Sequence, residues 1–143
     1  MTSFLIIVGA CILVFISLIH MYWACGGTWG SKVVLPMKKD SGEYTFVPRK
    51  IGTFAVAIAI LCFAMILLAQ SRYLFFWNAS DYTKWGCMIL AGIFFLRAVG
   101  DMKYVGFFKK VKGTKFSIYD TLLYSPLCLY IALIFVMAVL GSD

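Results

Sequence analysis

The sequence predicts an all-α integral membrane protein, a four-helix bundle whose two termini both lie on the extracytoplasmic side. Three observations support this prediction: the composition, the spacing of the apolar stretches and the placement of lysine and arginine. Of the 143 residues, 63% are hydrophobic and only 13% are charged, and the mean hydropathy is +0.94. These values exclude an ordinary soluble domain.

Four stretches are long enough to cross a bilayer, which takes about 20 mostly apolar residues per helix. They cover residues 4–23, 51–70, 85–104 and 121–140, and leave loops at 24–50 and 105–120. None of the stretches has a polar outer face, so a soluble helix bundle is excluded as well. We expect a single transmembrane domain over residues 1–143.

The basic residues orient these spans. The first loop carries five of them and the region from Lys103 onward another five, whereas the second loop carries only Arg72 and Lys84. Loops rich in lysine and arginine stay in the cytoplasm. Loops one and three are therefore expected to be cytoplasmic, and the net charge of +7 is a topology signal rather than a sign of nucleic-acid binding.

The third span is unusual because it carries two full charges, Arg97 and Asp101. A single arginine in the middle of a membrane helix costs about 2.5–3.5 kcal/mol on insertion scales. The two charges lie four residues apart, hence on one helical face, and Tyr104 continues that face. Since lipid offers no partner to either charge, we expect this face to turn inward, with Arg97 paired to Asp101.

Polar groups on two other spans are predicted at the same depth. His20, the only histidine, and Trp23 lie near the cytoplasmic end of the first span, and Asp120 and Tyr124 lie at the start of the fourth. Gly26, Gly27 and Trp29 follow the first span at the expected mouth. We expect these groups to line one polar chamber below the cytoplasmic surface.

The loop between the first two spans leaves two structures open. Two extended candidates, 32–37 and 44–47, flank an Asp-Ser-Gly turn, which favours a small hairpin over the mouth. A plain loop satisfies the sequence equally. In the fourth span, Pro126 removes one backbone donor and predicts a kink, at which Ser125 could satisfy the freed carbonyl.

Motifs of the common enzyme classes are absent: there is no G-x-S-x-G, P-loop or H-E-x-x-H sequence. A single histidine is a weak metal signal, so no metal site and no cofactor are predicted. The alternative to this prediction is a haem group with His20 as an axial ligand.

Several short motifs resemble those of a small bacterial membrane-protein family known as domain of unknown function 3995. They are the run His20 to Gly30 (HMYWACGGTWG), RAVGD at 97–101, YVGFFK at 104–109, GTKF at 113–116 and YSPLC at 124–128. The resemblance covers nearly the whole chain. It implies four helices in a bacterial plasma membrane, and it implies no activity.

Three hypotheses about function follow. In the first, a small amphipathic or anionic molecule, or a lipid headgroup, binds in the chamber: Arg97 holds the anion, Asp101 orients Arg97, and His20, Tyr104 and Tyr124 donate hydrogen bonds. Transport through such a site would need a homodimer to build a path. In the second, the protein is a membrane enzyme or redox protein that uses His20 with Asp101 or Asp120. In the third, it is a structural or assembly subunit whose charges serve packing alone.

Overall fold

The computed structural model describes residues 2–35, 48–74, 78–101, 103–111 and 113–141, and this part of the chain is helical, without a strand. Four helical segments are long and apolar enough to cross a membrane. They are α1 (Thr2–Ala24), α3 (Lys50–Gln70), α4 (Asp81–Val99) and the continuous segment formed by α5 (Lys115–Tyr119), the π-helical turn η1 (Asp120–Tyr124) and α6 (Ser125–Leu140). The predicted all-α fold with four helices able to cross a membrane is confirmed, and the protein is a multi-pass membrane protein.

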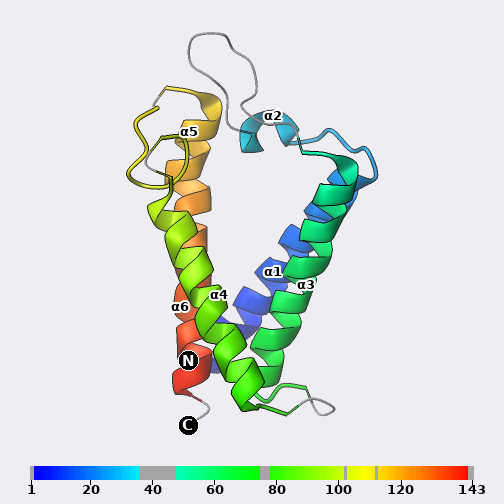
Figure 1. The fold of residues 1–143 in the computed structure, drawn as a ribbon, viewed down its shortest axis with the longest axis vertical. Helices are drawn as coiled ribbons and strands as arrows, with labels where there is room; N and C mark the ends of the chain where they lie inside the picture. The colour runs from blue at the N-terminus through cyan, green and yellow to red at the C-terminus, as the bar shows by residue number, and fades with distance from the viewer. Residues whose placement is uncertain (1, 36–47, 75–77, 102, 112, 142–143) are drawn as a thin grey trace.

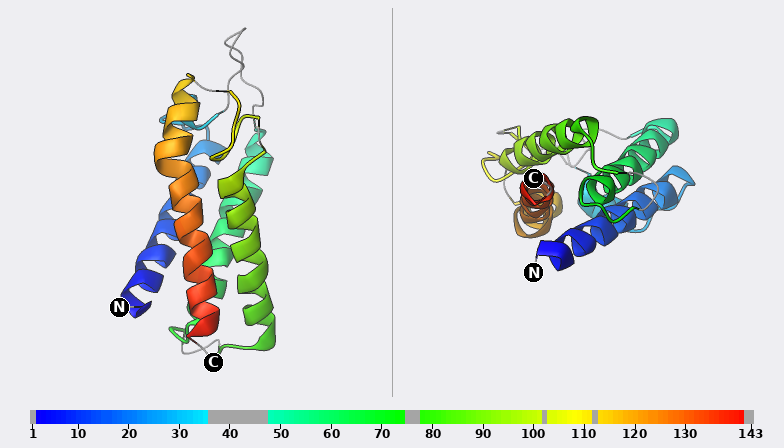
Figure 2. Two further views of the ribbon diagram at one scale, coloured as in Figure 1. Left: turned by 90° about the vertical axis from the view of Figure 1, so that its left-hand side faces the viewer. Right: turned by 90° about the horizontal axis from the view of Figure 1, so that it is seen from below.

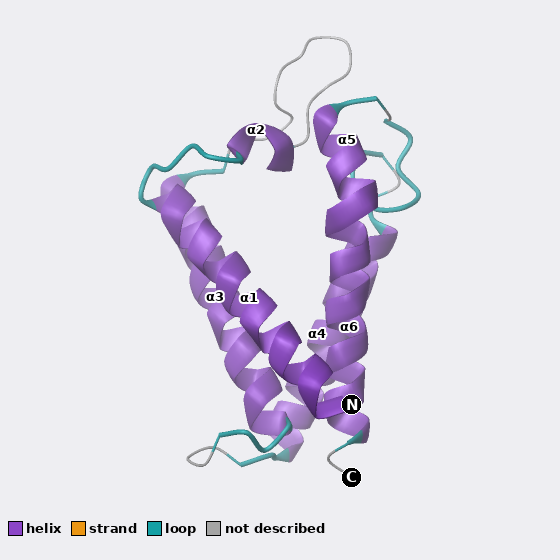
Figure 3. Ribbon diagram, turned by 180° about the vertical axis from the view of Figure 1, so that it is seen from behind, coloured by secondary structure: helices purple, strands orange, loops and turns teal. Residues whose placement is uncertain are grey.

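The helices pack as two pairs that diverge from a common end (Figure 1). Helix α1 lies along α3, and α4 lies along α6. The pairs meet at the end that holds both termini and separate toward the end that carries α5 and the short helix α2 (Ser31–Val34), as the view from behind also shows (Figure 3). Seen from below, the two pairs lie side by side (Figure 2). Helix α2 contacts α5 across the open end.

The buried core explains why the pairs join only at one end. Its side chains come from the first half of α1, the second half of α3, the first two-thirds of α4 and the last two-thirds of α6, the parts of these helices toward the end of the termini. The buried members are Ile6, Ala10, Leu13, Ala64, Leu67, Cys87, Leu90, Ala91, Ile131, Ile134, Phe135, Ala138 and Val139. Near the other end, the hydroxyl of Ser17 donates to the Ala57 carbonyl (2.7 Å) and ties α1 to α3.

Large apolar side chains cover the outside of the molecule. Phe4, Phe15, Leu122 and Leu133 are all more than half exposed. In water such a surface would drive aggregation, whereas in a bilayer it faces acyl chains without penalty. The outer surface is therefore the lipid-facing surface.

Helix α4 lies four to five residues earlier in the chain than the predicted span 85–104. It begins at Asp81 because Ser80 and Thr83 form a reciprocal capping box. It ends at Val99 because Gly100 adopts a φ of 90°, a conformation open to glycine and strained for other residues. Asp101 and Tyr104 consequently lie beyond the helix, and the predicted stripe from Arg97 to Tyr104 is wrong after Val99.

The fourth segment begins at Lys115, earlier than the predicted residue 121, and Pro126 lies in the first turn of α6. The preceding turn is a π-helix, in which the backbone N–H of Ser125 donates to the Asp120 carbonyl. A π-turn shifts the hydrogen-bond register by one residue. The proline is thereby accommodated, and the Ser125 hydroxyl is buried without a hydrogen-bond partner among the described residues, contrary to the predicted role for it.

The predicted hairpin is wrong for its first residues, since Ser31–Val34 is a short helix. The remainder of that prediction, residues 36–47, lies outside the described residues.

Candidate functional site

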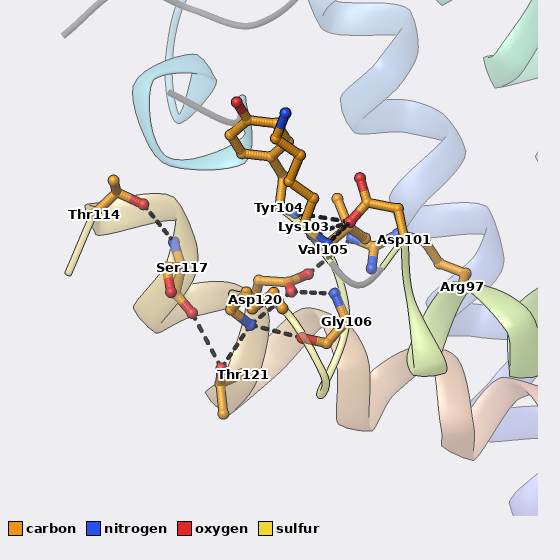
Figure 4. A network of polar contacts seen from close by, with 11 residues as sticks. Arg97, Asp101, Lys103, Tyr104, Val105, Gly106, Thr114, Ser117, Asp120 and Thr121 are labelled. Carbon is orange, nitrogen blue, oxygen red and sulfur yellow. Dashed lines mark hydrogen bonds and ion pairs between the residues drawn. The ribbon is translucent and has the colours of Figure 1, made fainter. Parts of the chain in front are cut away.

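Asp120 is the centre of a buried polar cluster at the open end of the molecule (Figure 4). It lies on η1, and its side chain is 0% exposed. Its Oδ1 accepts from Arg97 Nη2 at 2.9 Å, and its Oδ2 accepts from Lys109 Nζ at 2.9 Å and from the Gly106 backbone N–H at 2.7 Å. Both carboxylate oxygens are therefore occupied by charge-assisted or backbone hydrogen bonds.

Lys109 is the member of the cluster that sequence reasoning missed. Its side chain is only 2% exposed, although we counted it among the basic residues that orient the loop. Besides Asp120, its Nζ donates to the Gly106 carbonyl at 2.9 Å and to the Thr121 hydroxyl at 2.7 Å. A buried ammonium group needs three acceptors, and here it has them. The KK doublet at 109–110 gave no signal that one lysine points inward.

Arg97 pairs with Asp120, so the predicted pair with Asp101 is wrong. The reason is the end of α4 at Val99, which removes Asp101 from the helical face of Arg97. The Arg97 side chain is 34% exposed. Its Nη1 atom is nevertheless buried and has no hydrogen-bond partner among the described residues.

Asp101 is exposed, and its side chain accepts hydrogen bonds from the backbone. Its Oδ1 accepts from the backbone N–H groups of Lys103 (2.9 Å), Tyr104 (2.7 Å) and Val105 (2.8 Å). Partial burial alone would raise its pKa, but the backbone N–H groups favour the charged form and hold the pKa of Asp101 below its ordinary value. Asp101 therefore folds the loop that follows α4.

Two glycines allow that loop to return to the helix end. Gly100 and Gly106 have φ values of 90° and 88°, and a Cβ on Gly106 would overlap the Val99 carbonyl and the Gly100 Cα. The Phe107 backbone N–H then donates to the Ala98 carbonyl at 3.0 Å. This close approach brings the Gly106 N–H and Lys109 to Asp120.

The two tyrosines predicted for the site are half-buried near this cluster. The Tyr104 ring centroid lies 5.3 Å from Lys103 Nζ, a cation–π contact. The Tyr124 ring lies 6.2 Å from the Phe116 ring. Neither hydroxyl takes part in the hydrogen bonds around Asp120.

The predicted residues of the first span form a second cluster. His20 Nδ1 lies 2.8 Å from the Ile16 carbonyl oxygen. Because a carbonyl oxygen can only accept a hydrogen bond, Nδ1 carries the proton of the neutral ring and Nε2 carries none. The Trp23 ring lies 5.2 Å from the His20 ring, and Trp23 Nε1 donates to the Trp29 carbonyl at 2.7 Å. Trp29 is itself 74% exposed.

Gly26 and Gly27 make this turn possible. Gly26 has a φ of 101°, and a Cβ on Gly27 would overlap the Tyr22 ring. Within the described hydrogen bonds, none joins this cluster on α1 to the Asp120 cluster on α4 and η1. The single shell predicted from the sequence is therefore two separate polar clusters.

Two surface pockets are lined by residues that belong to neither cluster. One, of about 310 Å³, is lined by apolar residues of α4 and α6, and the other, of about 250 Å³, lies beside Ala24, Cys25, Lys50, Ile51 and Phe54. Among the described residues, no group of three or more histidine, cysteine, aspartate or glutamate side chains could hold a metal ion.

Comparison with known proteins shows which family the chain belongs to. No curated protein and no solved structure matches the chain. The family model described as "Protein of unknown function (DUF3995)" matches residues 13–135, a range that contains Arg97, Lys109 and Asp120. The chain therefore belongs to the DUF3995 family, as the sequence motifs indicated.

Proposed function

We propose that the protein binds the anionic group of a small amphipathic molecule or lipid at Arg97, near the cytoplasmic face of a bacterial plasma membrane. The observation that carries the proposal is the buried Nη1 atom of Arg97, which has no partner among the described residues. A buried charged donor without an acceptor is unfavourable, by about 1–3 kcal/mol or more. A bound anion would remove that penalty.

The charge of the cluster supports an anion rather than a cation. Arg97 and Lys109 carry two positive charges, and Asp120 supplies one negative charge. The cluster therefore keeps a net positive charge close to the apolar region of the bilayer, where uncompensated charge is costly. Arginine also suits carboxylate and phosphate groups, because its guanidinium presents parallel N–H donors.

The geometry supports one revision of the roles expected from the sequence. Asp120 takes the place of Asp101 as the group that orients Arg97, since it binds Nη2 and leaves Nη1 unpaired. The exposed third of the Arg97 side chain gives a ligand its approach. His20 and Trp23 belong to the opposite helix pair, and in the proposal they face the apolar part of the ligand.

The test uses dodecyl phosphate, an amphipathic anion, added to the full chain in an uncharged maltoside detergent. We expect dodecyl phosphate to raise the thermal unfolding temperature of the wild type. In the Arg97→Gln variant, the apparent affinity for dodecyl phosphate should fall about tenfold or more, because a hydrogen bond to a charged group is lost. Arg49→Gln removes the same charge from an exposed position and should bind like the wild type.

Equal binding by Arg97→Gln and Arg49→Gln would contradict the proposal. It would favour a structural role, which has its own support in the structure: both oxygens of Asp120 and the Lys109 ammonium already have partners within the protein. Under that reading, Arg97→Gln lowers thermal stability and leaves the response to dodecyl phosphate unchanged.

A further inference from the structure

The loop between α4 and α5 presents a basic and aromatic surface that nothing in the cluster around Asp120 uses. Its members are Lys103, Phe107, Phe108 and Lys110 in the loop and Lys115 at the start of α5, all exposed. Phe107 is 43% exposed and Phe108 is 67% exposed. We refer to these five residues as the loop platform.

We propose that the loop platform binds the headgroups of anionic membrane lipids. The first support is charge. The two acidic residues that flank it in the sequence are already engaged: Asp101 accepts three backbone N–H groups, and the buried Asp120 pairs with Arg97 and Lys109. The positive charges of the platform therefore have no acidic partner among the described residues, and an anionic surface is their complement.

The second support is the fold of the loop. The Val111 backbone N–H donates to the Lys103 carbonyl at 2.9 Å, so the chain returns to Lys103 one residue after Lys110. The two phenylalanines lie on the turn between them. Lysines beside aromatic rings are the composition of segments that rest in the headgroup region, where the rings enter the acyl boundary and the ammonium groups meet the phosphates.

The third support is preorganisation. Asp101 fixes the start of the loop, and Gly106 and Lys109 tie its middle to Asp120. A surface held in place by the fold loses little conformational entropy when it binds. The loop platform does not depend on the ligand proposed for Arg97, because its lysines are exposed whereas that site is the buried Nη1 atom of Arg97.

Native mass spectrometry of the full chain with equal amounts of phosphatidylglycerol and phosphatidylcholine, matched in acyl chains, tests the proposal. We expect the wild type to retain phosphatidylglycerol preferentially. Lys103→Gln/Lys110→Gln should reduce this preference about tenfold, given the attraction of each basic side chain to an anionic surface. Arg72→Gln/Lys84→Gln removes the same charge from the opposite end of the molecule and should keep the preference.

Three results would overturn the proposal. The Lys103→Gln/Lys110→Gln variant could retain phosphatidylglycerol as the wild type does, or the Arg72→Gln/Lys84→Gln control could lose the preference equally. Alternatively, inorganic phosphate could displace the lipid more strongly than sodium chloride of equal ionic strength, which would indicate a site for a soluble anion. Both variants keep Arg97, so a separate response to dodecyl phosphate still reports on the Arg97 site.

Discussion

A single carboxylate, Asp120, holds two cations that come from different segments of the chain. Arg97 reaches it from α4, and Lys109 reaches it from the loop that follows. Removing one partner from such a buried set leaves the others uncompensated, which is more damaging than the loss of an exposed ion pair. The stability of this end of the molecule should therefore depend on Asp120 more than on any exposed charge.

We predict that Asp120→Asn lowers the free energy of unfolding by about 3–5 kcal/mol, because the neutral amide leaves Arg97 and Lys109 side by side without a counter-charge. Denaturant unfolding in detergent micelles measures it. The matched control is Asp81→Asn, an exposed residue of the first turn of α4, which should cost about 1 kcal/mol or less. Similar losses of unfolding free energy in the two variants would show that the Asp120 cluster stabilises the protein no more than an exposed charge does.

At the scale of single residues, the sequence indicated some members of the Asp120 cluster but not which side chains pair with one another. Arg97 and Asp120 were both expected in one polar chamber, because the sequence predicts them at the same depth of the membrane. The partner of Arg97 was misassigned, since a four-residue spacing implies a contact only if the helix continues. The burial of Lys109 follows from the path of the loop, which no local pattern encodes.

At the scale of elements, the loop after α4 depends on the contact between Gly100 and Gly106. Both have positive φ values. A Cβ on Gly100 would overlap backbone atoms of Val105 and Gly106, and a Cβ on Gly106 would overlap backbone atoms of Val99 and Gly100. Gly113 has a similar φ of 89° but open space around it. Gly100 and Gly106 thus need both their conformation and their lack of a side chain, whereas Gly113 needs only its conformation.

We predict that Gly106→Ala destabilises the protein by more than Gly113→Ala. Gly113→Ala should cost about 1–2 kcal/mol through backbone strain alone, whereas Gly106→Ala adds the overlap with Val99 and Gly100. Hydrogen exchange of the backbone amide of Gly106, whose N–H binds Asp120, would locate the effect. Equal losses of stability would mean that the loop moves apart at no cost and that the close approach is dispensable.

The helix ends show why elements are easier to predict than their boundaries. The four apolar stretches were found because hydropathy averages over about twenty residues. The end of α4 depends on one glycine, and the start of the fourth segment depends on Thr114, whose hydroxyl accepts from the Ser117 N–H. Single residues of this kind are lost in the average. The π-turn before Pro126, in which the Ser125 N–H donates to the Asp120 carbonyl, is likewise a local feature that the average does not report.

On the scale of the whole molecule, the two diverging helix pairs could not be read from the sequence. Each helix is apolar on all sides, so hydropathy does not distinguish a face that contacts another helix from one that contacts lipid. The pairs join where small residues such as Ala10, Ala64, Ala91 and Ala138 permit close packing. The separation at the other end explains why the polar groups expected in one chamber form two clusters.

The orientation of the molecule is the remaining prediction at this scale. The basic loops predict that the open end, with the loop platform, faces the cytoplasm. Cys25 lies at this end and is exposed, whereas Asn78 lies in the connection between α3 and α4 at the other end and is also exposed. In a chain whose other four cysteines are replaced by alanine, a membrane-impermeant maleimide should label Cys25 only after permeabilisation of spheroplasts.

The converse variant, with Asn78→Cys as its single cysteine, should react in intact spheroplasts. If the two labelling patterns were reversed, the termini would be cytoplasmic, and the Asp120 cluster and the loop platform would both face the outside. The platform could then still meet anionic lipids, but those of the outer leaflet. The positive-inside rule opposes that arrangement, because it would place ten basic residues in the two translocated loop regions and only two in the loop that stays in the cytoplasm.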